Sequence, residues 1–222
     1  MRILYHLWLS PFSRKVRIVL AEKKLEFRLK AENVWERREE FLALNPAGEV
    51  PVLVDESGTV ISDSTAICEY LDEMFPNPPL IPGDPPERAE IRRLAAWFDG
   101  KFDREVTANL VGEKMMKRFL GMGNPDSAAI RAGAQNLHGH LSYIGWLSER
   151  RRYLAGDSFS LADIAAAAHL SAVDYLGDVP WEDHPAAKEW YARVKSRPSM
   201  RAILRDYIAG APPPAHYADL DF

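Results

Sequence analysis

The sequence predicts two domains, a small N-terminal α/β domain and a larger all-helical domain. Three observations predict this division. Short apolar runs alternate with helical patterns up to about residue 75. Six prolines follow among the eleven residues 76–86, and because proline fixes φ and removes a backbone donor, this stretch is expected to be a stiff linker. Beyond it the apolar spacing is helical as far as a tail that begins at Pro212.

Local signals justify each element of the first domain. An apolar strand over 2–7 precedes a helix over 12–23, an alternating strand over 26–30 and a polar helical stretch over 35–44. The runs 50–54 and 60–61 flank the turn sequence Asp-Glu-Ser-Gly, which predicts a hairpin. A last helix over 63–74 is predicted to carry Ala66, Ile67, Tyr70 and Leu71 on one face.

The second domain is predicted from long amphipathic stretches. Helices over 86–120 and 127–152 are separated by Gly-Met-Gly-Asn-Pro-Asp, which is rich in helix breakers. Ser160 and Asp163 have the spacing of a capping box at the start of the most apolar helix, and two more helices follow. We expect most of the six tryptophans to pack in the core; Trp97, Trp146 and Trp190 lie in the predicted helices. The predicted parts are therefore residues 1–75, the linker 76–86, the helical domain 87–211 and an extended tail 212–222.

The junction between the first strand and the first helix is the leading candidate for chemistry. Ser10 is a good N-cap and Pro11 suits the first helical turn, so free N–H groups should point toward Ser10. The Ser10-x-x-Ser13 spacing is that of a redox Cys-x-x-Cys motif with both sulfurs missing, which excludes disulfide exchange by the protein. Ser10 is either a plain helix cap or the activator of an incoming thiol.

Composition narrows the class of protein. With 222 residues, 47% hydrophobic residues and a net charge of -4, the chain is globular and has no basic footprint for nucleic acid. The single cysteine, Cys68, fits a reducing compartment and should be an inert packed thiol. No run is long enough to span a membrane, and His138-x-His140 on a helix would not face one metal ion. We expect a cytoplasmic protein without a metal or membrane insertion.

Five motifs in order resemble the glutathione transferase superfamily. They are Ser-Pro-Phe-Ser-Arg-Lys-Val-Arg-Ile-Val-Leu, Asn-Pro-Ala-Gly-Glu-Val-Pro-Val-Leu, the pair Asp63-Ser64, Ser-Phe-Ser-Leu-Ala-Asp-Ile-Ala-Ala-Ala and Arg-Pro-Ser-Met-Arg-Ala-Ile-Leu. The resemblance implies a thioredoxin-like N-terminal domain and a helical C-terminal domain. It also implies a cis peptide bond before Pro51, with Ser10 at the catalytic position and Pro51 and Ser64 shaping a glutathione pocket.

Two positions depart from the pattern of the superfamily. Glu49 stands where these transferases usually carry Lys or Gln toward a carboxylate of glutathione, and Asp63 replaces a longer Glu or Gln. A carboxylate facing a carboxylate is repulsive by about 1 kcal/mol or more at close range. We therefore expect weak or no glutathione binding and no other cofactor. The candidate ligand pocket comprises Ser10, Phe12, Glu49, Val50, Pro51, Asp63 and Ser64, with Ser10 a vestigial catalytic candidate.

Two further segments suggest partner binding. Trp35, Arg37 and Arg38 lie in a highly charged stretch beside the expected pocket, and an aromatic ringed by Arg is typical of a protein-binding hot spot. Alternatively, Trp35 covers the pocket. In the tail, three prolines should project the acidic and apolar residues Asp219, Leu220, Asp221 and Phe222 as a polyproline II segment; alternatively, the tail packs on the protein's own surface.

The stretches Val-Trp-Glu-Arg-Arg-Glu-Glu-Phe and Ser-Pro-Phe-Ser-Arg-Lys-Val-Arg, with the terminal Asp-Leu-Asp-Phe, resemble one bacterial branch of the superfamily. The resemblance implies a cell-division protein that binds the tubulin-like FtsZ filament as a homodimer. It further implies filament bending or bundling at the division site, with a second division partner reached through the tail. The alternative is a glutathione-dependent transferase or dehalogenase-like enzyme that uses Ser10.

Overall fold

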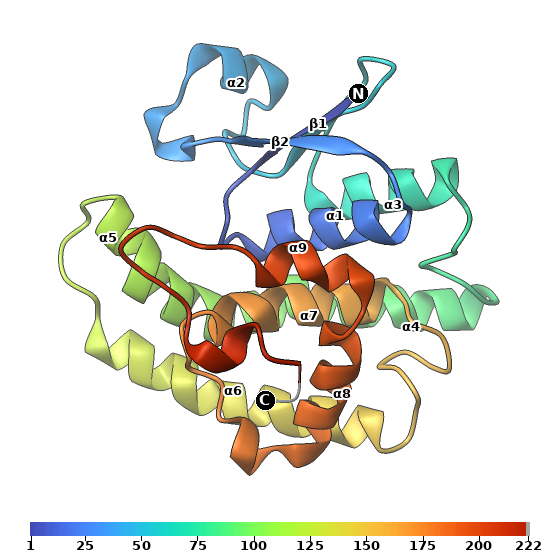
Figure 1. Cartoon of the computed structure of the whole chain (residues 1–222), viewed down its shortest axis with the longest axis vertical. Helices are drawn as coiled ribbons and strands as arrows, with labels where there is room; N and C mark the ends of the chain where they lie inside the picture. Colours follow the sequence, from blue (N-terminus) through green and yellow to red (C-terminus); the bar gives the residue numbers. More distant parts are fainter. Residues whose placement is uncertain (221–222) are drawn as a thin grey trace.

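A computed structural model describes residues 1–220 (Figure 1). A small sheet lies at one end of the molecule and a helical bundle at the other, with α1 (Pro11–Glu22) and α3 (Ser64–Met74) between them. This arrangement confirms the predicted fold class, a thioredoxin-like α/β domain followed by a helical domain.

The sheet has four strands in the order β2-β1-β3-β4. β1 (Arg2–His6) pairs in parallel with β2 (Phe27–Ala31), and α1 makes the crossover between them. β3 (Val52–Val54) is antiparallel to both β1 and β4 (Val60–Ser62), so the predicted hairpin is confirmed. The mixed sheet places the loop after β1 and the loop before β3 near the start of α1, where the candidate site lies.

The other helical segments follow in chain order. They are η1 (Val34–Glu36), α2 (Glu39–Leu44), α4 (Pro85–Ala96), the π-helical η2 (Trp97–Met116), α5 (Lys117–Phe119), α6 (Ser127–Ser148), α7 (Leu161–Asp174), η3 (Trp181–Asp183), α8 (Pro185–Lys195), η4 (Pro198–Met200), α9 (Arg201–Leu204) and η5 (Ala215–Tyr217).

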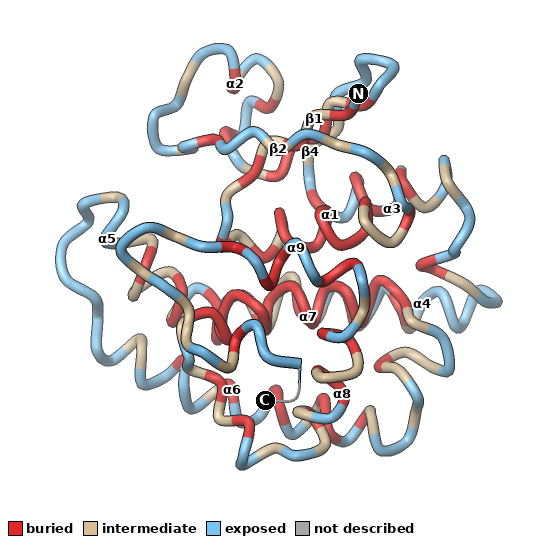
Figure 2. The backbone as a smooth tube through the Cα atoms, viewed as in Figure 1, coloured by how far each residue is buried: buried red, intermediate tan, exposed pale blue. Residues whose placement is uncertain are grey.

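Helix α7 is the centre of the core. All of its residues are buried (Figure 2), and it packs against α1, α4, α8 and η2. At its start, the Asp163 carboxylate accepts a hydrogen bond from the Ser160 backbone N–H (3.1 Å), as the predicted capping box requires, and a second one from the Ser160 hydroxyl (3.2 Å). The most apolar helix of the sequence is therefore the one that both domains cover.

The buried face of α3 differs from the apolar face expected for it, and the prediction that most tryptophans are core fails at Trp146. In α3 the buried positions are Ser64, Ile67, Cys68 and Leu71, so Ala66 is exposed. Both sets have helical spacing, and the contact with α1 selects the set rotated away from Ala66. Trp146 is 49% exposed because Leu147, the next residue of α6, takes the core position; the Trp146 ring stacks on Tyr143 instead. Trp190 is fully buried as predicted.

The basic residues of α1 join the two domains from inside. Arg17 donates to both Asp206 carboxylate oxygens (2.7 and 2.8 Å), and Arg14 lies 3.4 Å from the same carboxylate. All three residues are at most 7% exposed, and Arg14 also donates to the Ser171 hydroxyl at 2.9 Å. The charged side chains of Arg14 and Arg17 in α1 are thus buried because their partners come from the other domain.

The prediction that the prolines project the tail away from the body is wrong as far as Tyr217. The Tyr217 ring is fully buried against Tyr175, with ring centroids 5.1 Å apart, and its hydroxyl donates to the Ile203 carbonyl (3.0 Å). His216 lies beside Asp174 (3.1 Å). A large aromatic residue that finds an apolar cavity with a hydrogen-bond acceptor outweighs the stiffness of the prolines before it.

His6 predicts a pH dependence of folding. It is fully buried, and among the described residues neither ring nitrogen has a hydrogen-bond partner. Burial, helped by the charge of Arg17, lowers the pKa of His6 from 6.5 to about 4. Neutral His6 therefore makes its full contribution to the free energy of unfolding above pH 6.5. This contribution falls as the pH drops toward 4, by about 3 kcal/mol in total.

The measurement is urea unfolding of the wild type and of His6→Gln between pH 4.5 and 7.5. Between about pH 4.5 and 6 the unfolded wild type binds up to about one more proton through His6 than the folded state does, and near pH 7.5 the difference vanishes. We expect the free energy of unfolding to rise less steeply with pH in His6→Gln than in the wild type. The two slopes should differ by up to about 1.4 kcal/mol per pH unit. Parallel curves would show that His6 is solvated and titrates normally.

Candidate functional site

The start of α1 is fixed by its two serines. Ser10 is the N-cap, and its hydroxyl accepts a hydrogen bond from the Ser13 backbone N–H at 3.2 Å. The Ser13 hydroxyl accepts from the Leu7 N–H at 3.4 Å. Both hydroxyls of the Ser-x-x-Ser motif thus hold the junction between β1 and α1. This geometry is that of the plain helix cap, one of the two alternatives for Ser10.

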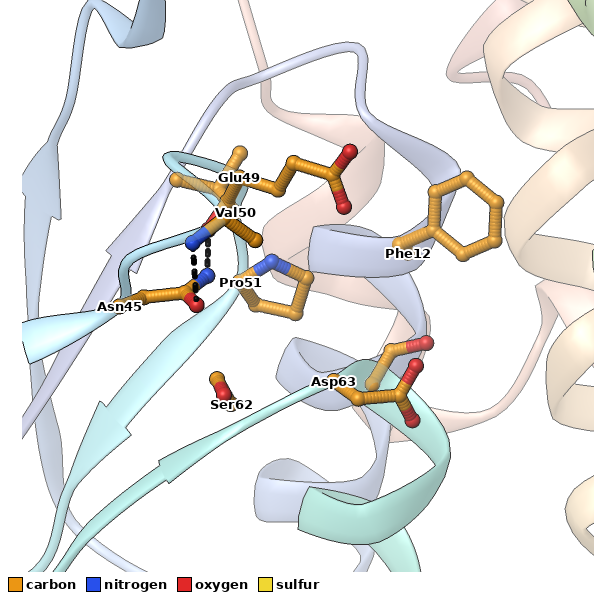
Figure 3. Close-up of a pocket in the computed structure, with 9 residues that line it drawn as sticks. Phe12, Asn45, Glu49, Val50, Pro51, Ser62 and Asp63 are labelled. Atoms are coloured by element: carbon orange, nitrogen blue, oxygen red, sulfur yellow. Dashed lines mark hydrogen bonds between the residues drawn. The ribbon is translucent and has the colours of Figure 1, made fainter. Parts of the chain in front are cut away.

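A pocket of about 270 Å³ opens beside this helix start (Figure 3). It is lined by Phe12, Asn45, Ala47, Glu49, Val50, Pro51, Ser62, Asp63 and Ser64. Six of the seven residues predicted for a ligand pocket lie together here, and Ser10 is not among the lining residues. Asn45, Ala47 and Ser62 were not predicted, although Asn45 and Ala47 lie within the motif that contains Glu49 and Ser62 precedes the pair Asp63-Ser64.

The loop before β3 positions Glu49. The Asn45 side chain accepts from the Ala47 N–H (3.2 Å) and donates to the Glu49 carbonyl (2.9 Å), so it ties both ends of the loop. Gly48 has φ +70°, a conformation that favours glycine, and Leu42 lies 3.1 Å from where a Cβ would stand. The peptide bond between Val50 and Pro51 is cis, as the family resemblance implied.

The start of α3 supplies the opposite wall. Asp63 is the N-cap of this helix, and its Oδ1 accepts from the backbone N–H groups of Thr65 (2.7 Å) and Ala66 (3.0 Å). Asp63 has φ +70°, a conformation in which Asp and Asn are more common than other side chains. Ser64 follows it and is only 4% exposed.

The lining residues do not fit glutathione well. Glutathione is a net anion, whereas the nine residues around the pocket include two carboxylates, Glu49 and Asp63, and no Lys, Arg or His. A carboxylate of the ligand would therefore meet like charge without a compensating cation in the wall. The geometry can accept hydrogen-bond donors and positive charge more readily than negative charge.

A buried polar cluster lies behind Phe12, and sequence reasoning missed it. The Phe12 ring meets His169 edge to face at 5.3 Å, His169 shares a hydrogen bond with the Thr107 hydroxyl (2.9 Å), and Lys15 pairs with Asp99. Burial acts to raise the pKa of Asp99, but hydrogen bonding from His169 and the Lys15 charge outweigh it, so the pKa is lowered. These residues come from three distant helices, and no local spacing signals their association.

The charged stretch around Trp35 lies at the surface. Trp35 is 39% exposed and does not line the pocket, so the alternative that it covers the pocket is not supported. Arg37 is exposed with φ +45°, and Arg38 pairs with Glu32, whose side chain is fully buried. The Glu32–Arg38 pair anchors this loop and leaves Trp35 and Arg37 facing solvent.

The last residues of the tail divide into two groups. Asp219 and Leu220 are exposed beyond the buried Tyr217. Asp221 and Phe222, the other two predicted partner-binding residues, lie outside the described residues. The docked segment through Tyr217 therefore brings the exposed residues to the surface of the helical domain rather than holding them at a distance.

Two classes of site are not found in the described part of the chain. No group of three or more His, Cys, Asp or Glu residues within 1–220 is arranged to hold a metal ion. None of the helices in that range combines the length and the apolarity needed to cross a lipid bilayer. The burial of Cys68 raises the pKa of its thiol to about 12, so its reactive thiolate form is disfavoured.

Comparison with known proteins agrees with the fold. Residues 9–74 match the model of the glutathione S-transferase N-terminal domain, and residues 125–198 match that of the C-terminal domain. The chain is 53% identical to FtsZ-localized protein A of Caulobacter vibrioides, with 100% of this chain and 98% of that protein covered.

Two solved structures extend the comparison. A glutathione S-transferase from Rhodospirillum rubrum F11 is 61% identical, with a TM-score of 0.98 and both chains covered completely. FzlA from C. crescentus is 53% identical, with a TM-score of 0.96 and coverage of 100% of this chain and 99% of that chain. On the domain matches and the full-length similarity, this chain belongs to the glutathione S-transferase family.

Proposed function

We propose that this protein is a non-catalytic member of its family that binds FtsZ filaments as a homodimer and promotes their bending or bundling during constriction. The observation that carries the proposal is the full-length similarity, at 53% identity, to FtsZ-localized protein A. The acidic pocket supports it, because a wall with Glu49 and Asp63 and no cation opposes glutathione. Recruitment to the division site in the cytoplasm follows from filament binding.

The proposed filament contact is the surface formed by Trp35, Arg37 and Arg38. Trp35 is partly exposed on a loop that the buried Glu32 anchors through Arg38, so it is presented on a rigid support. An aromatic side chain next to Arg is the kind of pair that dominates protein interfaces. Arg37 and the outer part of Arg38 supply cations that can pair with carboxylates of an acidic filament, although Glu36, Glu39 and Glu40 are exposed in the same stretch.

A homodimer would make this contact effective on a polymer. Two identical surfaces on one rigid body can bind neighbouring filaments or subunits, and the second contact then forms at high effective concentration. We place the dimer contact at the groove between η2 and α6, which is lined in part by Trp97 and Tyr143 and lies beside the exposed Trp146. Asp219 and Leu220, which are exposed at the surface of the helical domain, are the proposed contact for a second division partner.

Replacing Trp35 by alanine tests the filament contact. We expect Trp35→Ala to weaken binding to GTP-assembled FtsZ at least tenfold, because removing an aromatic hot-spot residue typically costs about 2 kcal/mol of binding free energy. Co-sedimentation with filaments gives the affinity, and thermal unfolding should change little because the ring is 39% exposed. Tyr207→Ala, which removes a 67% exposed aromatic from the other domain, is the matched control.

Unchanged pelleting of Trp35→Ala, or equal losses in both variants, would remove this loop from the interface. A large fall in melting temperature would place Trp35 in the core, contrary to its exposure. The enzyme alternative is favoured by one observation, the 61% identity to the Rhodospirillum glutathione S-transferase. If the protein is an enzyme, it should conjugate glutathione to an electrophile, and Ser10→Ala should abolish this activity. Our proposal expects no such activity in the wild type.

A further inference from the structure

Two histidines from different elements face each other on the helical domain. Nδ1 of His138, in α6, lies 2.9 Å from Nε2 of His184, the N-cap of α8, which is 46 positions further along the chain. Figure 1 shows α6 and α8 next to each other, at the end of the molecule remote from the sheet. His140 is not part of this pair, because its ring contacts Trp97 and Glu105. Tertiary packing therefore supplies the second imidazole that the His138-x-His140 spacing cannot.

The packing of α6 on α8 holds this pair in place without help from the imidazoles. A Cβ on Gly145 of α6 would stand 3.4 Å from the Cβ of Ala186, so the two helices approach closely. The Ser148 hydroxyl of α6 donates to the Ala186 carbonyl at 3.3 Å. The His184 side chain makes no cap hydrogen bond to α8. A ligand that needs both imidazoles thus finds them already placed, which lowers the entropy cost of binding.

The separation of the two nitrogens matches a pair of adjacent metal ligands. Two imidazole nitrogens about 2.1 Å from one ion lie about 3.0 Å apart when they occupy cis positions of an octahedron. The contact in the structure is a hydrogen bond between one donor and one acceptor nitrogen. When the donor ring changes tautomer, its proton moves to its other ring nitrogen and both facing nitrogens offer lone pairs. A metal ion can therefore replace the shared proton after a rotation of the two rings, and no proton has to leave the pair.

The surroundings of His184 favour a cation. It lines a cavity of about 240 Å³ together with Glu149 and Asp183, and none of the described residues that line this cavity is Lys or Arg. His138 and Asp183 are exposed, so hydrated ions can reach the pair. Within residues 1–220 no third His, Cys, Asp or Glu completes a set of protein ligands. Water would therefore fill the remaining positions, and the two carboxylates would act through their charge.

We propose that His138 and His184 together bind a divalent transition-metal ion of the kind that imidazole prefers, such as Ni²⁺, Cu²⁺ or Zn²⁺. The bound ion links the middle of α6 to the start of α8 and therefore stabilises the helical domain. Neither histidine lines the pocket beside α1 or the groove that contains Trp97 and Tyr143. The proposal is therefore independent of FtsZ binding and of the dimer contact.

Titration calorimetry with NiCl₂ tests the site, on a chain without a polyhistidine tag and in a buffer that does not chelate metals. We expect the wild type to bind Ni²⁺ saturably. His138→Gln and His184→Gln should each weaken binding at least tenfold, because one imidazole alone loses the effective concentration that the second one provides. His216→Gln is the matched control, since it removes a histidine of the same domain whose side chain is 37% exposed, and it should bind Ni²⁺ as the wild type does.

A second ion and a second readout make the test specific. Mg²⁺ prefers oxygen ligands, so it should bind far more weakly than Ni²⁺ if the imidazoles hold the ion. Ni²⁺ should raise the melting temperature of the wild type and of His216→Gln, and should raise those of His138→Gln and His184→Gln much less. Melting temperatures without metal show that each variant folds.

Four results would overturn the proposal. They are no saturable Ni²⁺ binding by the wild type, wild-type affinity in either His138→Gln or His184→Gln, an equal loss in His216→Gln, and Mg²⁺ binding as tight as that of Ni²⁺.

Discussion

Replacing Asp206 by alanine is expected to lower the free energy of unfolding by about 3–5 kcal/mol, because it leaves buried cations without their carboxylate. Arg14 and Arg17 are 0% and 3% exposed, and Asp206 is the carboxylate that both contact. These residues connect α1 of the first domain to the end of the helical domain. Chemical denaturation at neutral pH measures the loss.

Two controls make this result specific. Asp157→Ala removes an exposed carboxylate elsewhere in the helical domain and should change stability by no more than about 0.5 kcal/mol. The triple variant Arg14→Met, Arg17→Met and Asp206→Leu should recover part of the loss, because apolar residues can replace the buried ion pairs without leaving a charge unpaired. A cost below about 1 kcal/mol for Asp206→Ala would mean that the arginines are hydrated.

Tyr217→Ala is expected to cost about 3–5 kcal/mol, a loss typical of deleting a large buried ring. The ring is fully buried on Tyr175, so the tail is a stabilising part of the fold up to this residue. Tyr217→Phe removes the hydrogen bond to Ile203 alone and should cost about 1 kcal/mol. Tyr207→Ala, at 67% exposure, is the control for the loss of a surface tyrosine.

The same variants separate the two roles of the tail. If the tail only packs on the body, deletion of residues 218–222 should alter stability as Tyr217→Ala does. We expect instead that the deletion leaves stability nearly unchanged, because Asp219 and Leu220 are exposed. Equal melting temperatures for Tyr217→Ala and the wild type would contradict the docking of Tyr217.

The regular elements could be predicted because their signals are local. The hairpin follows from two apolar runs around a turn sequence, and α7 from a capping box before an apolar stretch. The buried charges of α1 could not be predicted in this way. Arg14 and Asp206 are 192 residues apart, and a helix rich in Arg and Lys normally indicates a solvated face.

The candidate site was predictable only in part, for the same reason. Glu49, Pro51 and Asp63 belong to motifs that the family resemblance identified, and the structure brings them together in one pocket. The hydroxyl of Ser10 accepts a hydrogen bond from its own helix. The residue spacing alone could not decide between a helix cap and a catalytic residue. The cluster of His169, Asp99 and Lys15 forms only through tertiary packing, so no local sequence pattern predicts it.

Co-sedimentation of the wild-type protein with purified FtsZ tests the central claim most directly. With GTP, which assembles FtsZ into filaments, the protein is expected in the pellet in a saturable amount, and with GDP it should stay in the supernatant. The same pelleted material should contain bent or bundled filaments by electron microscopy. Protein that remains in the supernatant at every filament concentration would contradict the proposed function.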